Sequence, residues 1–337
     1  MNLERAGPVL CFGEVLVRLS TGPGTKFSNA AEMAVHVGGA ESNVAALLAQ
    51  LGHAVEMITA LPNSALGDLC LSDLRRHGIG TSKLVRGEGR LGLYFFEPNG
   101  TGGRIIYDRS DSVFAAQAGE IDWLALPADA RWFHLSGINL ALGGKAAASA
   151  LTAATAMTNA GVPVSFDVNH RASLWDGKSE AELAAVRDVA GMADVLFASP
   201  GDISRLLGRD RPGDSADDRR AASQAAFAAF DRLQQVASTQ RIFGQANQHL
   251  SARIDTRERE YETNPAPLGD AIDRIGSGDA FAGAVIDGIL RGRAPEQCAN
   301  AGLAAAVAKH GMSGDRWIGT RQELEAFDPF RAGDVRR

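Results

Sequence analysis

The sequence has little cysteine, and the three residues it has are far apart. Cys11, Cys70 and Cys298 form no Cys-x-x-Cys pair. An odd, scattered set predicts buried free thiols in a reducing compartment rather than disulfides or a metal cage, so we expect a cytoplasmic protein. The seven histidines include no His-Glu-x-x-His arrangement, and no zinc site is expected.

Basic residues are not in excess either. The 34 lysines and arginines are outnumbered by 40 aspartates and glutamates, which gives a formal net charge of −6 over 337 residues. Nucleic acids and anionic membrane surfaces are bound by clustered Lys and Arg. We therefore expect neither of them as a partner.

Long uninterrupted apolar runs are also missing. The run Val9–Val17 is broken by Glu14 and has no basic prelude, so no secretory signal is expected. The stretch Ala146–Phe166 carries no charge and is long enough to cross a bilayer, but Gly161 and Pro163 interrupt it. This pattern predicts a helix, a turn and a buried strand rather than a membrane span.

What the sequence does contain is an alternation of short apolar runs and helical segments. The runs expected to form buried strands are Val9–Phe12, Val55–Thr59, Trp132–Leu135, Val162–Phe166 and Val195–Phe197. The segments expected to form helices are Glu41–Leu51, Leu66–His77, Gly144–Asn159 and Glu180–Ala190. This alternation predicts an α/β fold with a parallel sheet covered on both faces.

Other stretches interrupt the alternation. Val15–Ser20 with Ala34–Val37, and Arg90–Arg109, have the pattern of hairpin strands, the latter with a turn at Pro98-Asn99-Gly100. Small antiparallel strands inserted in an α/β core are typical of a lid over an active site. Arg209–Arg220 is dense in Asp and Arg and is predicted to be a solvated loop without function.

The chemistry of the protein is indicated by one motif, Gly276-Ser277-Gly278-Asp279. The glycines let the backbone turn sharply and present its N–H groups inward, and the apolar helical pattern that follows points its positive end at the same place. This arrangement predicts an anion hole, beside which Asp279 could accept the proton of an attacking hydroxyl. A plain helix N-terminus, with Asp279 complementing the helix dipole, is the alternative from local chemistry alone.

Two signatures resemble those of the ribokinase-like (PfkB) carbohydrate kinases. Asp273–Ala284 is similar to the family pattern Asp-Thr-x-Gly-Ala-Gly-Asp, although Arg274 replaces the Thr and Ser277 replaces the Ala. Gly38-Gly39-Ala40-Glu41-Ser42-Asn43 is similar to the family's N-terminal glycine pair. The resemblance implies that Asp279 is the catalytic base, that Gly276–Gly278 form the anion hole, and that Gly39 and Asn43 contact the sugar.

The resemblance also implies the architecture and the partners. We expect one kinase domain over residues 1–330, with a three-layer α/β/α core and a central, mostly parallel sheet. A small β lid would come from about residues 14–38 and 90–112, and residues 331–337 would form a tail. The expected partners are Mg·ATP, a small sugar acid and a second copy of the chain, bound through the lid.

Within the family, residues 9–325 resemble the 2-keto-3-deoxygluconate kinases, which phosphorylate the terminal hydroxyl of that acid. The resemblance places Tyr94, Tyr107, Arg109 and Arg171 around the substrate, and Arg guanidinium groups suit its carboxylate because they form paired hydrogen bonds. A kinase for fructose or another hexose is one alternative. A sugar sensor without catalytic activity is another.

The nucleotide side departs from the family pattern. Many members carry Val-x-Lys-x-Gly-x-x-Gly, whereas residues 236–247 here lack the Lys and the glycine pair. We hypothesise that Thr239 and Arg241 replace the lost contacts. Asn300 still matches a position that lies near the nucleotide in relatives.

Two other nucleotide-binding classes are excluded. Gly87–Gly92 satisfies the dinucleotide pattern Gly-x-Gly-x-x-Gly, but a strand pattern follows it where a helix is needed. Gly177-Lys178-Ser179 has Ala172 where a P-loop requires its first glycine.

Overall fold

The computed structural model describes residues 1, 3–99, 102–175, 177–210, 213, 215–243, 248–269 and 271–331. Among these, nine strands form the central sheet, with eight in the order β14-β13-β12-β11-β10-β9-β1-β4 and β15 beside β13. The strands are β1 (Val9–Phe12), β4 (Val55–Ile58), β9 (Trp132–Ser136), β10 (Val164–Asp167), β11 (Val195–Phe197), β12 (Gln235–Phe243), β13 (Gln248–Thr256), β14 (Glu260–Glu262) and β15 (Ala266–Leu268). Pairing is parallel from β4 to β12 and antiparallel beyond it.

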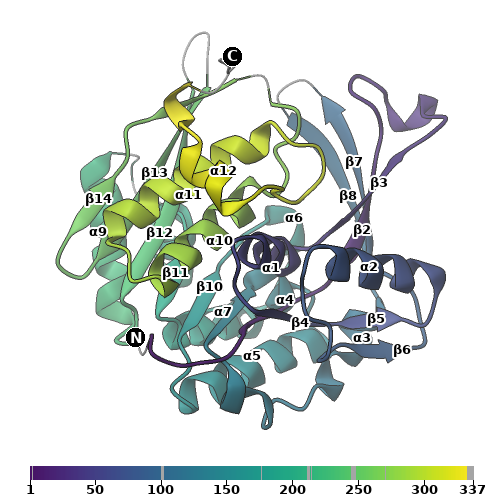
Figure 1. Cartoon of the computed structure of the whole chain (residues 1–337). Helices are drawn as coiled ribbons and strands as arrows, with labels where there is room; N and C mark the ends of the chain where they lie inside the picture. The colour runs from purple at the N-terminus through teal and green to yellow at the C-terminus, as the bar shows by residue number, and fades with distance from the viewer. Residues whose placement is uncertain are drawn as a thin grey trace.

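Helices cover both faces of this sheet (Figure 1). On one face Leu10, Phe12 and their neighbours pack against α3 (Val113–Gln117), α5 (Gly144–Asn159), α7 (Glu180–Met192), α8 (Pro200–Leu206) and α9 (Ala216–Ala229). On the other face Val9 and Cys11 pack with α1 (Ala40–Gln50), α2 (Ala65–Arg76), α10 (Ser277–Leu290) and α11 (Pro295–His310). Shorter helices are α4 (Gly137–Ala141), α6 (Ala172–Trp175) and α12 (Arg321–Ala326). Burial on both faces explains why the strands are continuous apolar runs, and the expected three-layer α/β/α core is confirmed.

The predicted lid strands form a separate sheet of four strands, in the order β3-β2-β7-β8. They are β2 (Leu16–Ser20), β3 (Ala34–Gly38), β7 (Leu93–Asn99) and β8 (Gly102–Asp108). Two antiparallel pairs, β2–β3 and β7–β8, are joined by a parallel pairing of β2 with β7. A further small sheet contains β5 (Ala60–Pro62) and β6 (Val85–Gly87). Gly100 of the predicted turn and residues 332–337 of the predicted tail lie outside the described residues.

The expectation of a functionless loop over Arg209–Arg220 is wrong in its second half. Helix α9 begins at Ala216, because Ser215 accepts a hydrogen bond from the amide of Asp218 while the Asp218 carboxylate accepts from the amide of Ser215. Arg219 is buried and lies 2.6 Å from Glu262. The charges of this segment therefore stabilise a helix: Asp218 caps α9, and Arg219 binds it to β14 at the edge of the sheet.

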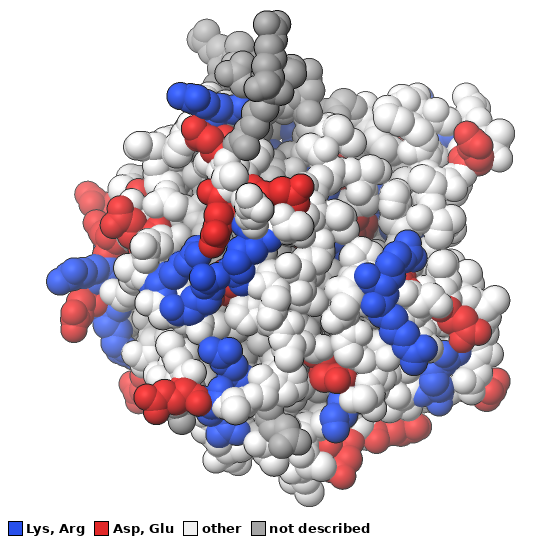
Figure 2. All heavy atoms as spheres, in the orientation of Figure 1, with Lys and Arg blue, Asp and Glu red and all other residues white. Residues whose placement is uncertain are grey.

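The uncharged stretch at 146–166 forms most of α5 followed by β10, as predicted. Among the described residues no helix is both long enough and apolar enough to cross a membrane. On the face shown in Figure 2, acidic and basic side chains are interspersed.

Candidate active site

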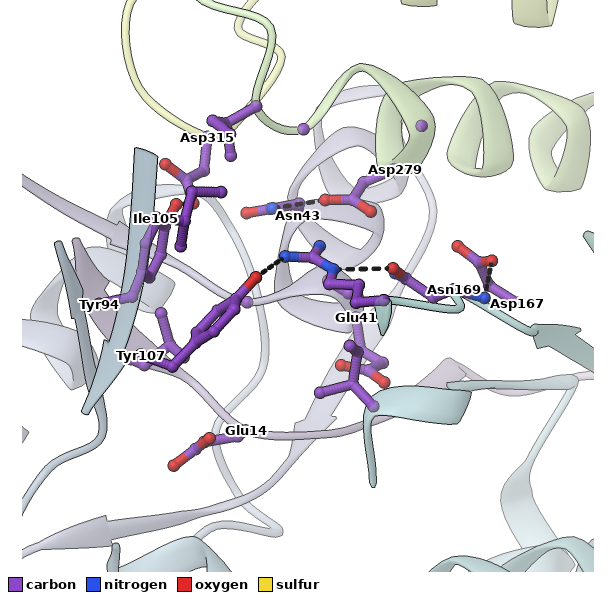
Figure 3. A pocket seen from close by; sticks show the side chains of 18 of the residues that line it. Glu14, Glu41, Asn43, Tyr94, Ile105, Tyr107, Asp167, Asn169, Asp279 and Asp315 are labelled. Atoms are coloured by element: carbon purple, nitrogen blue, oxygen red, sulfur yellow. Dashed lines mark hydrogen bonds between the residues drawn. The ribbon is translucent and has the colours of Figure 1, made fainter. Parts of the chain in front are cut away.

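A cavity of about 590 Å³ lies where the core meets the lid (Figure 3). Its walls are the carboxyl ends of β1 and β10, the N-termini of α1 and α10, and the inner face of β7 and β8. The lining residues are Glu14, Leu16, Gly39, Ala40, Glu41, Asn43, Tyr94, Ile105, Tyr107, Arg109, Ile138, Asp167, Asn169, Arg171, Arg274, Ile275, Gly276, Gly278, Asp279 and Asp315. The carboxyl edge of the parallel strands is where an open α/β sheet binds its ligands.

The segment Asp273–Gly278, which we call the anion loop, turns sharply into α10. Gly276 has φ +85°, and a Cβ there would lie 1.7 Å from the carbonyl oxygen of Asp315, so only glycine fits. No protein acceptor among the described residues bonds the amides of Gly278 and Asp279. Ser277 is the first residue of α10. The loop thus presents free N–H groups at the positive end of a helix, as an anion hole requires.

Asp279 lies in the first turn of α10 and is 8% exposed. Its Oδ2 accepts a hydrogen bond of 2.6 Å from Nδ2 of Asn43. Burial raises the pKa of Asp279 to about 7, against the hydrogen bond from Asn43 and the charge of Arg171, which lower it. A carboxylate whose pKa lies near neutrality suits general base catalysis.

Asn43 reaches Asp279 because it lies in the first turn of α1, whose N-terminus lines the same cavity as the N-terminus of α10. The helix starts at Gly39, which has φ +137° and whose Cβ would meet the carbonyl oxygen of Glu14 at 2.2 Å. The Oδ1 of Asn43 is buried and has no hydrogen-bond partner among the described residues. Since a buried acceptor without a partner is costly, this oxygen is suited to receive a substrate hydroxyl.

Arg171 lines the same cavity as Asp279, and its positive charge lowers the pKa of that carboxyl group. Its Nε donates to Oδ1 of Asn169 at 3.1 Å, and its Nη1 donates to the hydroxyl of Tyr107, as the dashed lines in Figure 3 show. The guanidinium carbon lies 5.9 Å from the centre of the Tyr107 ring. Arg171 forms no ion pair with a carboxylate among the described residues, so its charge remains available to an anionic ligand.

Tyr94 and Arg109 also line the cavity, but protein groups already occupy their polar ends. Arg109 forms a buried ion pair of 2.5 Å with Glu14. The hydroxyl of Tyr94 donates to Oδ2 of Asp315 at 2.5 Å. Of the two arginines predicted around the substrate, only Arg171 therefore has an unpaired charge.

Several acidic residues of the cavity were not predicted from the sequence, among them Glu14, Glu41, Asp167 and Asp315. Burial raises the pKa of Asp167 to about 8, and Asp279 adds to this effect. Asp167 ends the buried strand β10, and Glu14 lies two residues after β1. Polar residues that follow buried parallel strands were the signal that could have found them.

Two arginines meet next to the anion loop. Nη1 of Arg241, on β12, and Nη2 of Arg274, in the loop, both donate to Oε1 of Gln248, at 3.2 and 2.8 Å. Nη2 of Arg241 also lies 3.2 Å from Nε2 of His310, and Nδ1 of that ring is 2.7 Å from the carbonyl oxygen of Ala306. The imidazole therefore donates through Nδ1 and accepts through Nε2. In the described part of the chain neither arginine forms an ion pair.

The other predicted nucleotide contacts are Thr239 and Asn300. Thr239 precedes Arg241 by two residues and projects from the same face of β12. Asn300, on α11, lines a separate hollow with Arg293 and Phe327, and the structure does not bring it into the cavity of Asp279. Residues 244–247 of the altered segment lie outside the described residues.

Known carbohydrate kinases are similar to this chain over most of its length. Residues 8–316 match the model of the pfkB family of carbohydrate kinases. The chain is 30% identical over 331 residues to the 2-dehydro-3-deoxygalactonokinase of Haloferax volcanii, which covers 97% of this chain and 98% of that protein. It is 28% identical to the 2-dehydro-3-deoxygluconokinase of Bacillus subtilis over 86% of this chain and 85% of that one. The crystal structure of the 2-dehydro-3-deoxygluconokinase of Thermotoga maritima matches with a TM-score of 0.88 and 32% identity, over 95% of this chain and 98% of that one.

The fold, the anion loop and the buried carboxylate therefore define a kinase of small molecules, a phosphotransferase whose acceptor is an alcohol group. The chain belongs to the pfkB family of carbohydrate kinases.

Proposed function

We propose that this kinase transfers the γ-phosphoryl group of ATP to the terminal hydroxyl of 2-keto-3-deoxygluconate. The observation that carries the proposal is the Arg171 guanidinium, which lines the same cavity as Asp279 and forms no ion pair with a carboxylate in the described part of the chain. A sugar acid that spans the cavity would bind its carboxylate at one end and present its terminal hydroxyl at the other. A neutral hexose would offer the half-buried Arg171 guanidinium no carboxylate, so it would gain none of the paired, charge-assisted hydrogen bonds that the acid forms.

Three residues would hold the acid. Asn169 and Tyr107 hold the guanidinium of Arg171 in place. Arg171 would donate two parallel hydrogen bonds to the carboxylate of the acid. The free Oδ1 of Asn43 would accept a hydrogen bond from a substrate hydroxyl. Gly39 would let the chain approach the sugar closely. Tyr94 and Arg109 would shape the wall, because Asp315 and Glu14 already bind their polar groups.

In the chemical step Asp279 would accept the proton of the terminal hydroxyl as its oxygen attacks the γ-phosphorus. The bond from the γ-phosphorus to the bridging oxygen breaks, and ADP leaves with the electron pair. The amides at Gly276–Gly278 would stabilise the charge on the transferred group. Mg²⁺, bound mainly through the phosphates as is usual for this ion, would neutralise the charge that develops on them.

The phosphates of ATP would lie between the anion loop and the arginine pair. Arg241 and Arg274 have unpaired charges there, and they are well placed to replace the Lys that other family members carry. Thr239 would add a hydroxyl contact from the same strand face. Asn300 lies ten residues before His310, which is about 15 Å along α11, so it would contact only the base end of the nucleotide.

We further propose that two copies associate through the outer face of the lid, in the cytoplasm. Val35, Leu19, Phe95 and Ile106 are register partners across the four lid strands and form one apolar row. Val35 and Ile106 are 54% and 39% exposed, which favours burial against a second copy. The three cysteines are buried and unpaired, which fits a reducing compartment.

The experiment that tests the function is an ADP-release assay with Mg·ATP. The panel contains 2-keto-3-deoxygluconate, its galactonate epimer, fructose, ribose and a blank without sugar. We expect turnover selective for the keto-deoxy acids. Turnover with a neutral sugar alone would discard the role of Arg171, and the absence of turnover with every sugar would favour a sensor.

A further inference from the structure

Lys309 is a buried cation that the chemistry above does not use. It lies at the carboxyl end of α11 with none of its surface exposed. Its Nζ donates to two backbone carbonyl oxygens, those of Met312 at 3.0 Å and of Asp273 at 3.4 Å. Within the described ranges it has no carboxylate at ion-pair distance. Burying an ammonium group without a direct counter-ion is expensive, so its location requires an explanation.

The two carbonyl groups belong to the two segments that meet at the anion hole. Asp273 begins the anion loop, and Met312 precedes the stretch that leads to Asp315. The backbones of these segments are in contact at Gly276, where a Cβ would lie 1.7 Å from the carbonyl oxygen of Asp315. The Lys309 ammonium therefore links the anion loop to the segment that leads to Asp315. These are the two segments whose contact fixes the conformation of Gly276.

The carboxylates of the same segments are held separately. Arg18, from β2, binds Oδ2 of Asp273 and lies 2.9 Å from Oδ1 of Asp315. Oδ2 of Asp273 also accepts from the amide of Gly314 at 3.1 Å. Arg18 thus binds the side chains while Lys309 binds the backbone. Asp273 and Asp315 partly offset the burial that lowers the pKa of Lys309.

We propose that Lys309 is a positioning residue for phosphoryl transfer. Its ammonium group holds the carbonyls of Asp273 and Met312 and thereby keeps the amides of Gly276–Gly278 aimed at the transferred phosphoryl group. The residue acts on the transition state through the loop and touches neither sugar nor nucleotide. Its loss should therefore lower kcat and leave KM for both substrates nearly unchanged, because a small displacement of catalytic groups costs rate before it costs binding.

The test is Lys309→Met, which removes the ammonium group and leaves an unbranched side chain one atom shorter. We expect kcat to fall about 10²-fold, as for a displacement of about 1 Å in a catalytic group. Ammonium chloride should restore at least a tenth of the lost rate in a saturable manner, because an ammonium ion can occupy the space between the two carbonyls. Tetramethylammonium chloride at equal concentration should not, because the ion is too large.

The matched control is Lys178→Met, which removes a surface lysine that pairs with Glu182. This variant should keep the wild-type kcat and ignore ammonium. All proteins are assayed with whichever sugar the wild type phosphorylates, so an error about the substrate would not affect the outcome. Folding is checked by circular dichroism and thermal melting.

Several results would overturn the proposal. A Lys309→Met variant with near wild-type kcat would remove the role, and so would a folded, slow variant that does not respond to ammonium. If Lys309→Met does not fold, Lys309→Gln is measured, since its carboxamide keeps a donor. Failure of both variants to fold in the presence of ammonium would make Lys309 a requirement of the core rather than a positioning residue.

Discussion

At the scale of single residues, the site depends on a carboxylate that burial keeps only partly ionised at neutral pH. Asp279 shares its cavity with Glu41 and Asp315, which add to the effect of burial on its pKa, whereas Asn43 and Arg171 oppose it. The proton affinity of Asp279 is thus set by residues from α1, the segment after β10 and the C-terminal segment together. Each of them can be changed separately.

Replacing the base tests its role most directly. Asp279→Asn keeps an acceptor for the Asn43 amide, so the variant should fold normally. We expect kcat to fall by about 10²–10⁴-fold with little change in KM, since that is the usual cost of losing a positioned base. Steady-state kinetics with both substrates varied would measure it. A variant that retained more than half of the wild-type rate would exclude Asp279 as the base.

The raised pKa of Asp279 predicts a pH dependence. The base works only when it is ionised, so kcat/KM should rise with pH through about 7 and level off above it. Since Asn43 lowers the pKa of Asp279, Asn43→Ala should move this limb to higher pH, whatever it does to the height of the plateau. Rates between pH 5.5 and 9 in overlapping buffers would locate both limbs. A limb near pH 4, where an ordinary aspartate titrates, would contradict the prediction.

The proposed contact of Arg171 with the substrate carboxylate can be tested with acidic and neutral sugars. At pH 9, above the range in which Asp279 titrates, Arg171→Ala should lower kcat/KM for 2-keto-3-deoxygluconate by about 10²-fold, because a hydrogen bond to a charged group is worth about 1.5–3 kcal/mol. Any activity with fructose should be unchanged at this pH, where the loss of the Arg171 charge no longer affects the ionisation of Asp279. Arg171→Lys keeps the charge but loses the paired geometry, so its loss should be intermediate. An equal loss for the acid and for fructose would show that Arg171 supports the cavity rather than the carboxylate.

Part of this site could be predicted from the sequence alone. The glycines and the carboxylate at the start of a helix indicated Asp279 from local chemistry, whereas Gly39 and Asn43 were predicted from the resemblance to the pfkB kinases. The state of Arg109 could not be predicted. Its partner Glu14 is 95 residues away, and the pairing exists only because the lid strand docks against the end of β1. Such a contact leaves no local signal.

At the scale of elements, the main surprise is the antiparallel edge of the sheet. β12 and β13 pair over nine positions, yet residues 238–241 are polar and have no strand-like alternation of apolar residues. Neighbouring strands and α11 supply the stability that the local pattern lacks. The same long β12 extends Arg241 toward the anion loop, where we propose that it replaces the missing lysine.

The arginine pair predicts a separable effect on the nucleotide. Arg274→Met should raise KM for ATP about tenfold or more, because one charge-assisted hydrogen bond is lost, and should leave KM for the sugar unchanged. Arg241→Met should act in the same way. Direct titration with ATP or tripolyphosphate would check the affinity without turnover.

The control for this pair is Arg76→Met, whose side chain is 67% exposed on α2. It should behave as the wild type in every assay. If Arg241→Met and Arg274→Met bind ATP and tripolyphosphate as tightly as the wild type does, the pair has a structural role, and the phosphates must bind to the anion loop alone.

At the scale of the whole molecule, the layered core was predictable and the lid sheet only partly so. Alternating strands and helices indicate three layers, and each of these elements can be recognised from consecutive residues. The joining of the lid through the parallel pair β2–β7 is not local, since β3, α1 and α2 lie between the two strands in the chain. This pairing places two hairpins in one sheet with a pocket face and an outer face.

The two faces of the lid predict that association and sugar binding are coupled. Tyr94 and Tyr107 face the pocket, while Phe95 and Ile106 alternate with them and face away. A second copy bound to the outer face would hold the same strands that close the pocket. The wild type should therefore sediment at twice the mass of the chain. Val35→Glu with Ile106→Glu should produce monomers whose KM for the sugar rises about tenfold. In a monomer the sugar must order the lid strands itself, and the entropy lost in ordering them weakens its binding.

Leu124→Glu is the matched control, because Leu124 is 89% exposed and lies outside the lid sheet. It should leave both mass and KM unchanged. A wild type that stays monomeric at micromolar concentration would refute association through the lid. Monomeric Glu variants with wild-type KM would keep the dimer but separate it from catalysis, because the lid strands would then be ordered by the core alone through contacts such as that between Arg109 and Glu14.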